Sequence, residues 1–332
     1  MAERALVTGA AGFIGSHIVE ALLARGDDVV GLDNFDDFYD PAVKRENLRH
    51  VGSHPGFRLV EADVRDADRV RHVLADARPD LVVHLAARAG VRPSIEAPAL
   101  YADVNVRGTA VLLAAARDAG VARIVFSSSS SVYGDASPVP FRESEPAVQP
   151  VSPYAATKRA AELLCETFAR LEPRLRIISL RLFTVYGPRQ RPDLAIHKFT
   201  RLIAAGQPVP FFGDGTASRD YTYITDIVQG ILAAIERTRQ PSVEHEIYNL
   251  GESATTTLSD LIAMLEAALG RSARLDRKPP QPGDVRRTFA DVSRARAALG
   301  YAPSVPIRDG IARFVAWFRE STAELAPPPA RQ

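Results

Sequence analysis

Short apolar runs alternate with stretches of helical spacing through the first half of the chain, and this alternation limits the fold more than any other feature. The runs lack a polar residue at every second position, so we expect strands covered on both faces, as in a parallel sheet. Helices between such strands form the covering layers, which predicts a doubly wound α/β sheet. The predicted strands are Ala5–Thr8, Val29–Leu32, Phe57–Val60, Leu81–Leu85, Ile124–Ser127 and Ile177–Leu180. The predicted helices are Gly15–Arg25, Asp66–Ala77, Ala97–Ala119 and Pro153–Leu171.

The pattern changes after Arg181, where turn-rich stretches such as 186–193 and 213–218 separate shorter elements. This favours a smaller lobe over the ligand edge of the sheet. Its expected helices lie near Leu194–Ala205, Ser259–Leu269 and Ile307–Glu320. Glu246–Leu250 has the composition of a buried strand that rejoins the first sheet. We therefore predict a first domain over 1–185 to which about 220–250 returns, an interleaved C-terminal lobe over 186–325, and a loose tail over 326–332.

The composition is that of an ordinary globular protein, with 46% hydrophobic residues and a formal net charge of +1. No basic stripe is interleaved with aromatic residues and no apolar run reaches membrane-spanning length, so we expect neither a nucleic-acid nor a membrane partner. The single cysteine, Cys165, fits a small buried apolar residue, and no histidine or cysteine cluster has metal-ligand spacing. The first strand begins too early to leave room for a signal peptide, which predicts a cytoplasmic location.

A glycine triplet, Gly9, Gly12 and Gly15, joins the first predicted strand to the first helix. Glycine lets backbone N–H groups approach a pyrophosphate closely, and the helix N-terminus adds a partial positive charge there. Asp33 ends the second strand, where a carboxylate accepts hydrogen bonds from both ribose hydroxyls of adenosine and repels a 2′-phosphate. No arginine occurs in 34–37, so we expect a Rossmann domain that binds NAD rather than NADP. Further expected contacts, which also fit plain loop residues, are Phe13, Ile14, Asn34, Asp63, Val64, Leu85, Ala86 and Ala87.

Tyr154 and Lys158 are four residues apart on one predicted helix, so their side chains share a face. Only four of the 41 basic residues are lysines, and a serine run, 127–131, ends the strand just upstream. A solvated helix face would give the same spacing, but the serine run favours hydride chemistry with Tyr154 as the base. A free tyrosine has a pKa of ~10. We expect Lys158 and the positive charge of a bound nicotinamide to lower it.

With these motifs, the chain from Ala5 to about Phe318 resembles the extended short-chain dehydrogenases that act on nucleotide sugars. The resemblance implies that Ser129 is the catalytic serine and that Asn105 supports the active and cofactor site from its helix. It also implies a homodimer formed through the helices 97–119 and 153–171.

Ser130 and Ser131 stand before Val132-Tyr133-Gly134, where the 4,6-dehydratases of this family carry an Asp-Glu pair. Elimination of water needs such acid and base groups. Their replacement by serines favours oxidation at C4, rotation of the 4-keto sugar and return of the hydride, which is epimerisation.

The segment 181–193 resembles that of UDP-glucuronate 4-epimerases, because Thr184 stands where UDP-galactose 4-epimerases commonly have asparagine. The resemblance implies that Arg191 and Thr184, with Ser130 or Ser131, bind the sugar carboxylate, which a guanidinium matches in charge and shape. Oxidation at C4 makes a β-keto acid, and we hypothesise that Arg191 holds its carboxylate out of the alignment that releases CO₂.

The nucleotide end rests on the same resemblance, which implies that Phe212 lies near uracil and that Arg219 meets the diphosphate. Gln281 precedes Gly283-Asp284 where many relatives have an arginine, and Gln281 and Asp284 are expected substrate contacts. The missing charge could come from Arg92 or from Arg287.

The leading hypothesis is therefore an NAD-dependent UDP-glucuronate 4-epimerase that makes UDP-galacturonate. A 4-epimerase of a neutral or N-acetylated UDP-hexose differs from it mainly at the positions of Thr184 and Arg191. A non-catalytic NAD-binding scaffold is the alternative from another class, and the intact set of Ser129, Tyr154 and Lys158 argues against it.

Overall fold

The computed structural model describes residues 2–279, 285 and 287–324. A seven-stranded sheet lies at the centre of this part of the chain, in the order β11-β6-β5-β4-β1-β2-β3. Every pair of neighbours in it is parallel. The strands are β1 (Arg4–Thr8), β2 (Asp28–Asp33), β3 (Phe57–Glu61), β4 (Leu81–His84), β5 (Arg123–Ser129), β6 (Arg176–Leu182) and β11 (His245–Leu250). The predicted doubly wound Rossmann-type sheet is therefore confirmed.

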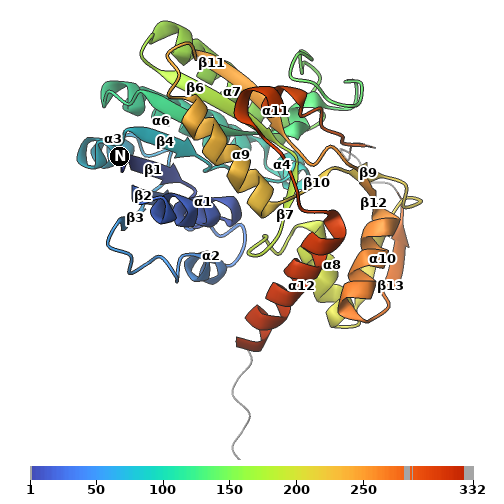
Figure 1. The fold of residues 1–332 in the computed structure, drawn as a ribbon. Coiled ribbons are helices and arrows are strands. Elements are labelled where there is room, and N and C mark those ends of the chain that lie inside the picture. Colours follow the sequence, from blue (N-terminus) through green and yellow to red (C-terminus); the bar gives the residue numbers. More distant parts are fainter. Residues whose placement is uncertain (1, 280–284, 286, 325–332) are drawn as a thin grey trace, which may run out of the picture.

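Helices cover both faces of the sheet (Figure 1), which explains why its inner strands, such as β1 and β4, are almost entirely buried. One face packs against α1 (Phe13–Ala24) and α9 (Ile224–Arg237), with Ile18, Leu22 and Ile231 in the core. The other face packs against α3 (Ala67–Ala77), α6 (Gly108–Asp118) and α7 (Pro153–Leu171). The one cysteine, Cys165, is buried in this second core.

The helix predicted over Ala97–Ala119 is not one regular helix. The chain forms α5 (Pro98–Ala102), then a π-helical turn, η1 (Asp103–Arg107), and then α6. The π turn carries Asn105, whose side chain bonds to the backbone of a neighbouring loop instead of facing a regular helical neighbour. Single π-helical turns of this kind frequently occur at functional sites.

Four helices were not predicted, namely α2 (Pro41–Asn47), α4 (Val91–Glu96), α9 and α11 (Ser293–Leu299). Three of them are only six or seven residues long, too short for a clear helical period. The long one, α9, has Ile224, Ile227, Ile231 and Ile235 on its buried face. Isoleucine is β-branched and favours strands, so composition obscured the helical spacing.

The remaining elements form a layer beside the carboxyl edge of the sheet, built from three two-stranded pairs and three helices. The parallel pairs are β7 (Thr184–Tyr186) with β10 (Tyr221–Tyr223) and β8 (Pro208–Phe212) with β13 (Arg274–Lys278). The antiparallel pair is β9 (Ser218–Arg219) with β12 (Thr256–Thr257). The helices α8 (Ala195–Ala204), α10 (Leu258–Leu269) and α12 (Ile307–Glu324) pack together at the far side (Figure 1).

Candidate active site

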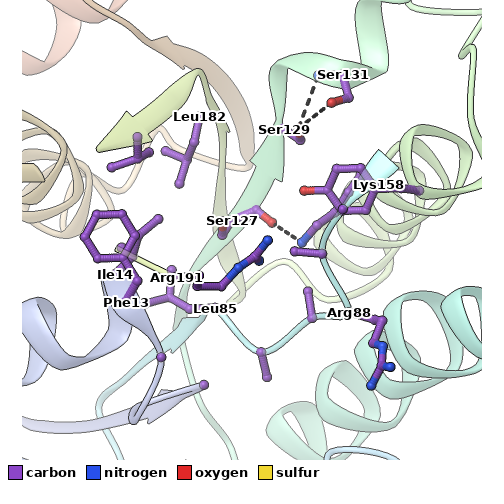
Figure 2. Close-up of a pocket in the computed structure, with 18 of the residues that line it drawn as sticks. Phe13, Ile14, Leu85, Arg88, Ser127, Ser129, Ser131, Lys158, Leu182 and Arg191 are labelled. Atoms are coloured by element: carbon purple, nitrogen blue, oxygen red, sulfur yellow. Dashed lines mark hydrogen bonds between the residues drawn. The ribbon is translucent and has the colours of Figure 1, made fainter. Parts of the chain in front are cut away.

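A cavity of about 460 Å³ opens at the carboxyl edge of the sheet, beside the point where the strand order reverses between β1 and β4. Ligands of doubly wound sheets bind at this point because loops on either side diverge there. Its walls come from the turn after β1, the loops after β2 to β6, and β9 of the second layer. Figure 2 shows side chains from these elements around the cavity.

The turn after β1 is too tight for any residue but glycine at two positions. Gly9 has φ +70°, and a Cβ atom there would lie 2.8 Å from the Ala86 nitrogen. A Cβ on Gly15 would lie 2.0 Å from the Gly9 carbonyl oxygen. Gly12 caps α1, and Phe13 and Ile14 of its first turn line the cavity with the three glycines. The helix N-terminus therefore faces the cavity with no side chain in between.

Asp33, at the end of β2, is buried and also lines the cavity. Its carboxylate accepts hydrogen bonds from the N–H groups of Ala11 at 3.0 Å and Phe35 at 2.9 Å. Burial raises the pKa of this carboxyl above its usual value, while these two bonds and Lys44 act in the opposite direction. The group is thus fixed between the glycine turn and the β2 loop.

The other expected cofactor contacts line the same end of the cavity: Asn34, Asp63, Val64, Leu85, Ala86 and Ala87. The Asn34 amide donates to the Asp63 carboxylate at 2.9 Å. Hydrogen bonds from Arg65 lower the pKa of Asp63 to about 2.

Asn105 does not line the cavity but fixes a loop that does. Its amide oxygen accepts from the Arg88 N–H at 2.7 Å, and its amide nitrogen donates to the Arg88 carbonyl at 2.9 Å. The same nitrogen donates to the Thr157 hydroxyl on α7 at 3.0 Å. Asn105 therefore connects the loop after β4 to the helix that carries Tyr154 and Lys158.

Tyr154, Lys158 and Ser129 meet in the middle of the cavity. Lys158 is buried and donates from Nζ to the carbonyl oxygen of Ser127 at 2.7 Å, the bond drawn in Figure 2. The Ser129 hydroxyl donates to that of Ser131 at 3.1 Å and also hydrogen-bonds with the Tyr154 side chain. The strand β5 and the helix α7 thus bring the three residues together as the sequence predicted.

The groups around the Tyr154 phenol have opposing effects on its pKa. Burial raises the pKa of this phenol above its usual value, while the hydrogen bond with Ser129 and the charge of Arg191 act in the opposite direction. The ammonium of Lys158 is directed at the Ser127 carbonyl and is itself desolvated. That desolvation lowers the pKa of Lys158 to about 8.

The residues expected at the sugar carboxylate belong to the same cavity as Tyr154. Ser130, Ser131, Thr184 and Arg191 all line it. The Arg191 guanidinium donates from Nε and Nη2 to the Asp193 carboxylate at 3.0 and 2.8 Å. The charge of Arg191 lowers the pKa of Tyr154, so the guanidinium and the phenol are electrostatically coupled.

The residues expected at the nucleotide are only partly gathered. Arg219 lines the cavity, whereas Arg92 and Phe212 lie outside its lining and contact each other, with the guanidinium carbon 5.2 Å from the ring centre. Arg287 is exposed and stacks on Phe289. Gln281 and Asp284 lie outside the described residues.

Sequence reasoning missed, among other residues that line the cavity, a group of charged and aromatic side chains. Arg88 forms an ion pair with Asp36, and its guanidinium carbon lies 4.8 Å from the centre of the Phe38 ring. Arg191 lies over the same ring at 5.3 Å, so two guanidinium groups contact Phe38. Lys44 is 4.9 Å from the centre of the Tyr39 ring. Only their position in the sequence indicated a place in the site, because residues 36–39 come shortly after Asp33 and Arg88 directly follows Leu85–Ala87.

Within 2–279, 285 and 287–324, no three histidine, cysteine, aspartate or glutamate side chains are placed to share a metal ion. The described helices include none with the length and apolarity needed to cross a bilayer.

Known proteins resemble this chain over nearly its whole length. A UDP-glucuronate 4-epimerase from Thermodesulfobacterium geofontis is 40% identical, covering 95% of this chain and 96% of its own. The crystal structure of UDP-glucuronic acid 4-epimerase from Bacillus cereus, in complex with UDP-glucuronic acid and NAD, is 37% identical with a TM-score of 0.88. It covers 96% of this chain and 99% of its own. The structure of UDP-glucose 4-epimerase from Thermotoga maritima with UDP-glucose is 35% identical with a TM-score of 0.87, at the same coverages.

A model of the NAD dependent epimerase/dehydratase family matches residues 5–251, which span the central sheet from β1 to β11 and contain the glycine turn, Asp33, Ser129, Tyr154 and Lys158. With relatives of 40% identity along its length, the chain belongs to the NAD dependent epimerase/dehydratase family.

Proposed function

We propose that this protein is a UDP-glucuronate 4-epimerase, which interconverts UDP-glucuronate and UDP-galacturonate through a 4-keto sugar. The observation that carries the proposal is that Arg191 and Thr184 line the same cavity as Tyr154, Lys158 and Ser129. A cation beside a tyrosine base suits a substrate whose carboxylate is on the carbon next to the one being oxidised. The relatives named UDP-glucuronate 4-epimerase support the same substrate.

The residues at the glycine end fit NAD. A Cβ on Gly9 or Gly15 would fill the turn where a pyrophosphate approaches, and Asp33 stands where it can accept from ribose hydroxyls. Gly9, Gly12, Gly15, Phe13 and Ile14 would hold the pyrophosphate, Asn34, Asp63 and Val64 the adenosine, and Leu85, Ala86 and Ala87 the middle of the cofactor. Bound NAD supplies the hydride acceptor for oxidation and the donor for reduction.

In the proposed reaction Tyr154 takes the proton of the sugar 4-hydroxyl while the hydrogen on C4 leaves as hydride. Ser129 bonds the same sugar oxygen and holds it at the phenol. The positive charge of Lys158 favours the phenolate form of Tyr154, which is the form that can accept the proton of the sugar hydroxyl. When the keto sugar has turned its other face, the same groups return the proton as the hydride comes back. Ser130 and Ser131 precede Val132, so the acid and base groups that a dehydratase needs are not found at these two positions.

Arg191, Thr184 and one of Ser130 and Ser131 are proposed to hold the uronate carboxylate. We propose that Arg219 contacts the diphosphate and that Phe212 contacts uracil, with the Arg92 guanidinium beside the Phe212 ring. We keep Gln281 and Asp284 as proposed contacts from the sequence alone.

The division of labour between two lobes is also proposed. Residues 1–185 with 220–250 would bind the cofactor, and 186–325 would bind the UDP-sugar. The packing of α9 and β11 against the central sheet supports this interleaving. We further propose a cytoplasmic homodimer formed through residues 97–119, which contain α5, η1 and α6, and through α7. In the single chain, Leu163 and Leu171 of α7 are 47% and 71% exposed, so this helix has apolar side chains that a second subunit could cover.

Proton NMR of UDP-glucuronate with the purified protein tests the function. We expect a new sugar spin system with a small H3–H4 coupling, as in a galacto product, and no such signal with Tyr154→Phe. UDP-glucose in a parallel tube is the control substrate. Turnover of UDP-glucose alone would reject the uronate assignment, and turnover of neither sugar with NAD present would reject the epimerase.

A further inference from the structure

Glu162 lies one helical turn after Lys158 on α7, outside the cavity lining, and is completely buried. Its carboxylate accepts from the Ser128 hydroxyl at 2.5 Å and from Arg159 Nη1 at 2.9 Å. It also accepts two bonds from Arg181 on β6, from Nε and Nη2, each at 2.9 Å. One carboxylate thus joins α7, β5 and β6 beneath the proposed catalytic residues.

These bonds fix the two elements whose relative position the chemistry needs. Ser128 directly precedes Ser129 at the carboxyl end of β5, while Glu162 shares its helix with Tyr154 and Lys158. A shift of α7 along β5 would separate the Ser129 hydroxyl from the phenol, and it would first have to break the Ser128–Glu162 bond. We propose that Glu162 is a positioning residue, whose carboxylate holds the serine end of β5 against the face of α7 that carries Tyr154 and Lys158. This inference rests on the proposed function.

The burial of this group argues against a role in stability alone. The Arg181 and Glu162 side chains are 1% and 0% exposed. Desolvation makes such a pair costly, and apolar residues of similar volume often serve stability as well. Arg181 is also held by the Tyr133 ring, 4.7 Å from its guanidinium carbon, and the Tyr133 hydroxyl donates to Asn249 at 2.7 Å. The Glu162 carboxylate is therefore fixed by Arg181 on the β6 side as well as by Ser128 on the β5 side.

The carboxylate also contributes charge to the site. The groups that face it are Lys158, Arg159 and Cys165 of α7, Ser128 of β5, Arg181 of β6 and His245 of β11. Among them Lys158 has its charged form favoured by Glu162, against the desolvation that lowers its pKa. Removal of the negative charge should therefore make Lys158 lose its proton at lower pH.

Glu162→Gln tests the role of the negative charge, and Glu162→Asp tests the role of the side-chain length. Glu166→Gln is the matched control. Glu166 lies one turn further on the same helix, in a partly exposed ion pair with Arg170. In Glu162→Gln we expect the alkaline limb of the kcat profile to move down by about one pH unit, with KM within about twofold of wild type. Glu162→Asp should leave that limb in place and lower kcat by about tenfold, because the shorter side chain cannot hold Ser128 and Arg181 together. Glu166→Gln should match the wild type.

A folded Glu162→Gln protein with wild-type kcat and alkaline limb would overturn the inference. If that variant does not accumulate in folded form, Ser128→Ala decides, because it removes one hydroxyl without changing charge. We expect its kcat to fall at least fivefold, with KM and the alkaline limb unchanged. A wild-type kcat in Ser128→Ala would likewise overturn the inference. Both results are read only after the wild type turns over UDP-glucuronate and Tyr154→Phe does not, so a failure of the proposed function is recognised separately.

Discussion

The ammonium of Lys158 donates to the main-chain carbonyl of Ser127, with the two atoms 2.7 Å apart. This bond holds the charge two residues before Ser129, at the carboxyl end of β5. The same burial that fixes it lowers the pKa of Lys158 to about 8. The group is therefore mainly cationic at pH 7 and loses its charge as the pH rises through 8.

Because the charged form favours the Tyr154 phenolate, we expect kcat to fall as the pH rises above about 8. Lys158→Arg keeps a positive charge at all these pH values. We expect it to lower kcat by about 100-fold through its different shape and to abolish the alkaline limb. Initial rates between pH 6 and 10 measure both effects, and an unchanged limb in Lys158→Arg would show that another group titrates.

The second prediction concerns Arg191, the guanidinium that contacts Phe38 and Asp193. Arg191→Ala should raise KM for UDP-glucuronate by about 10- to 100-fold, because a charge-assisted pair is lost. It should also release more 4-keto pentose, because the carboxylate is free to align for loss of CO₂. Mass spectrometry of the products measures this, with Arg201→Ala on the exposed side of α8 as control. The clamp hypothesis fails if Arg191→Ala changes neither quantity.

The third prediction concerns cofactor choice. Asp33→Asn removes the charge that repels a 2′-phosphate, so we expect the ratio of NAD to NADP affinity to fall at least tenfold. One of the two backbone bonds to Ala11 and Phe35 also needs rearrangement, which should lower the free energy of unfolding by about 1 kcal/mol. Titration calorimetry with each cofactor measures the ratio. Asp37→Asn, an exposed carboxylate in the same loop, should leave it unchanged.

The fourth prediction concerns the pH dependence of stability. His84 is buried between the hydroxyls of Thr8 and Thr109, and desolvation lowers its pKa to about 3. In the unfolded chain a histidine titrates near ~6.5, so only the unfolded state gains this proton between those values. Stability is therefore complete above pH 6.5 and falls as the pH drops towards 3.

We expect His84→Gln to reduce the loss of unfolding free energy between pH 7 and 5 by about 1–2 kcal/mol. Urea denaturation at the two pH values measures the loss. His50→Gln, at an exposed position, is the control and should retain the wild-type dependence. Equal slopes in the two variants would assign the pH dependence to other groups.

The central sheet was predictable because its strands are buried on both faces. Each of the seven predicted runs begins and ends within two residues of the observed strand. The strands β9 and β12 are two residues each and exist only because they pair across 37 residues of chain. Such segments have no local period, so the sequence could not predict them.

The same distinction applies to the site. Gly9, Asp33, Tyr154 and Lys158 belong to local patterns whose geometry follows from one turn or one helix. Phe38 and Arg88 are 50 residues apart, and their contact depends on how two loops pack against each other. The π turn at Asn105 also depends on a distant backbone, that of Arg88. Sequence reasoning therefore reached the proposed catalytic residues and missed many of the contacts that hold them in place.

The pairing of β11 with β6 has a consequence for synthesis of the protein. Until about residue 250 has left the ribosome, β6 is the outer strand of the nascent sheet, with its N–H and C=O groups unpaired on one side. Unpaired apolar edges of this kind recruit strands from other chains. Truncation after residue 185 should therefore give an aggregating fragment, and a chaperone that shields this edge should improve the yield of the full-length chain.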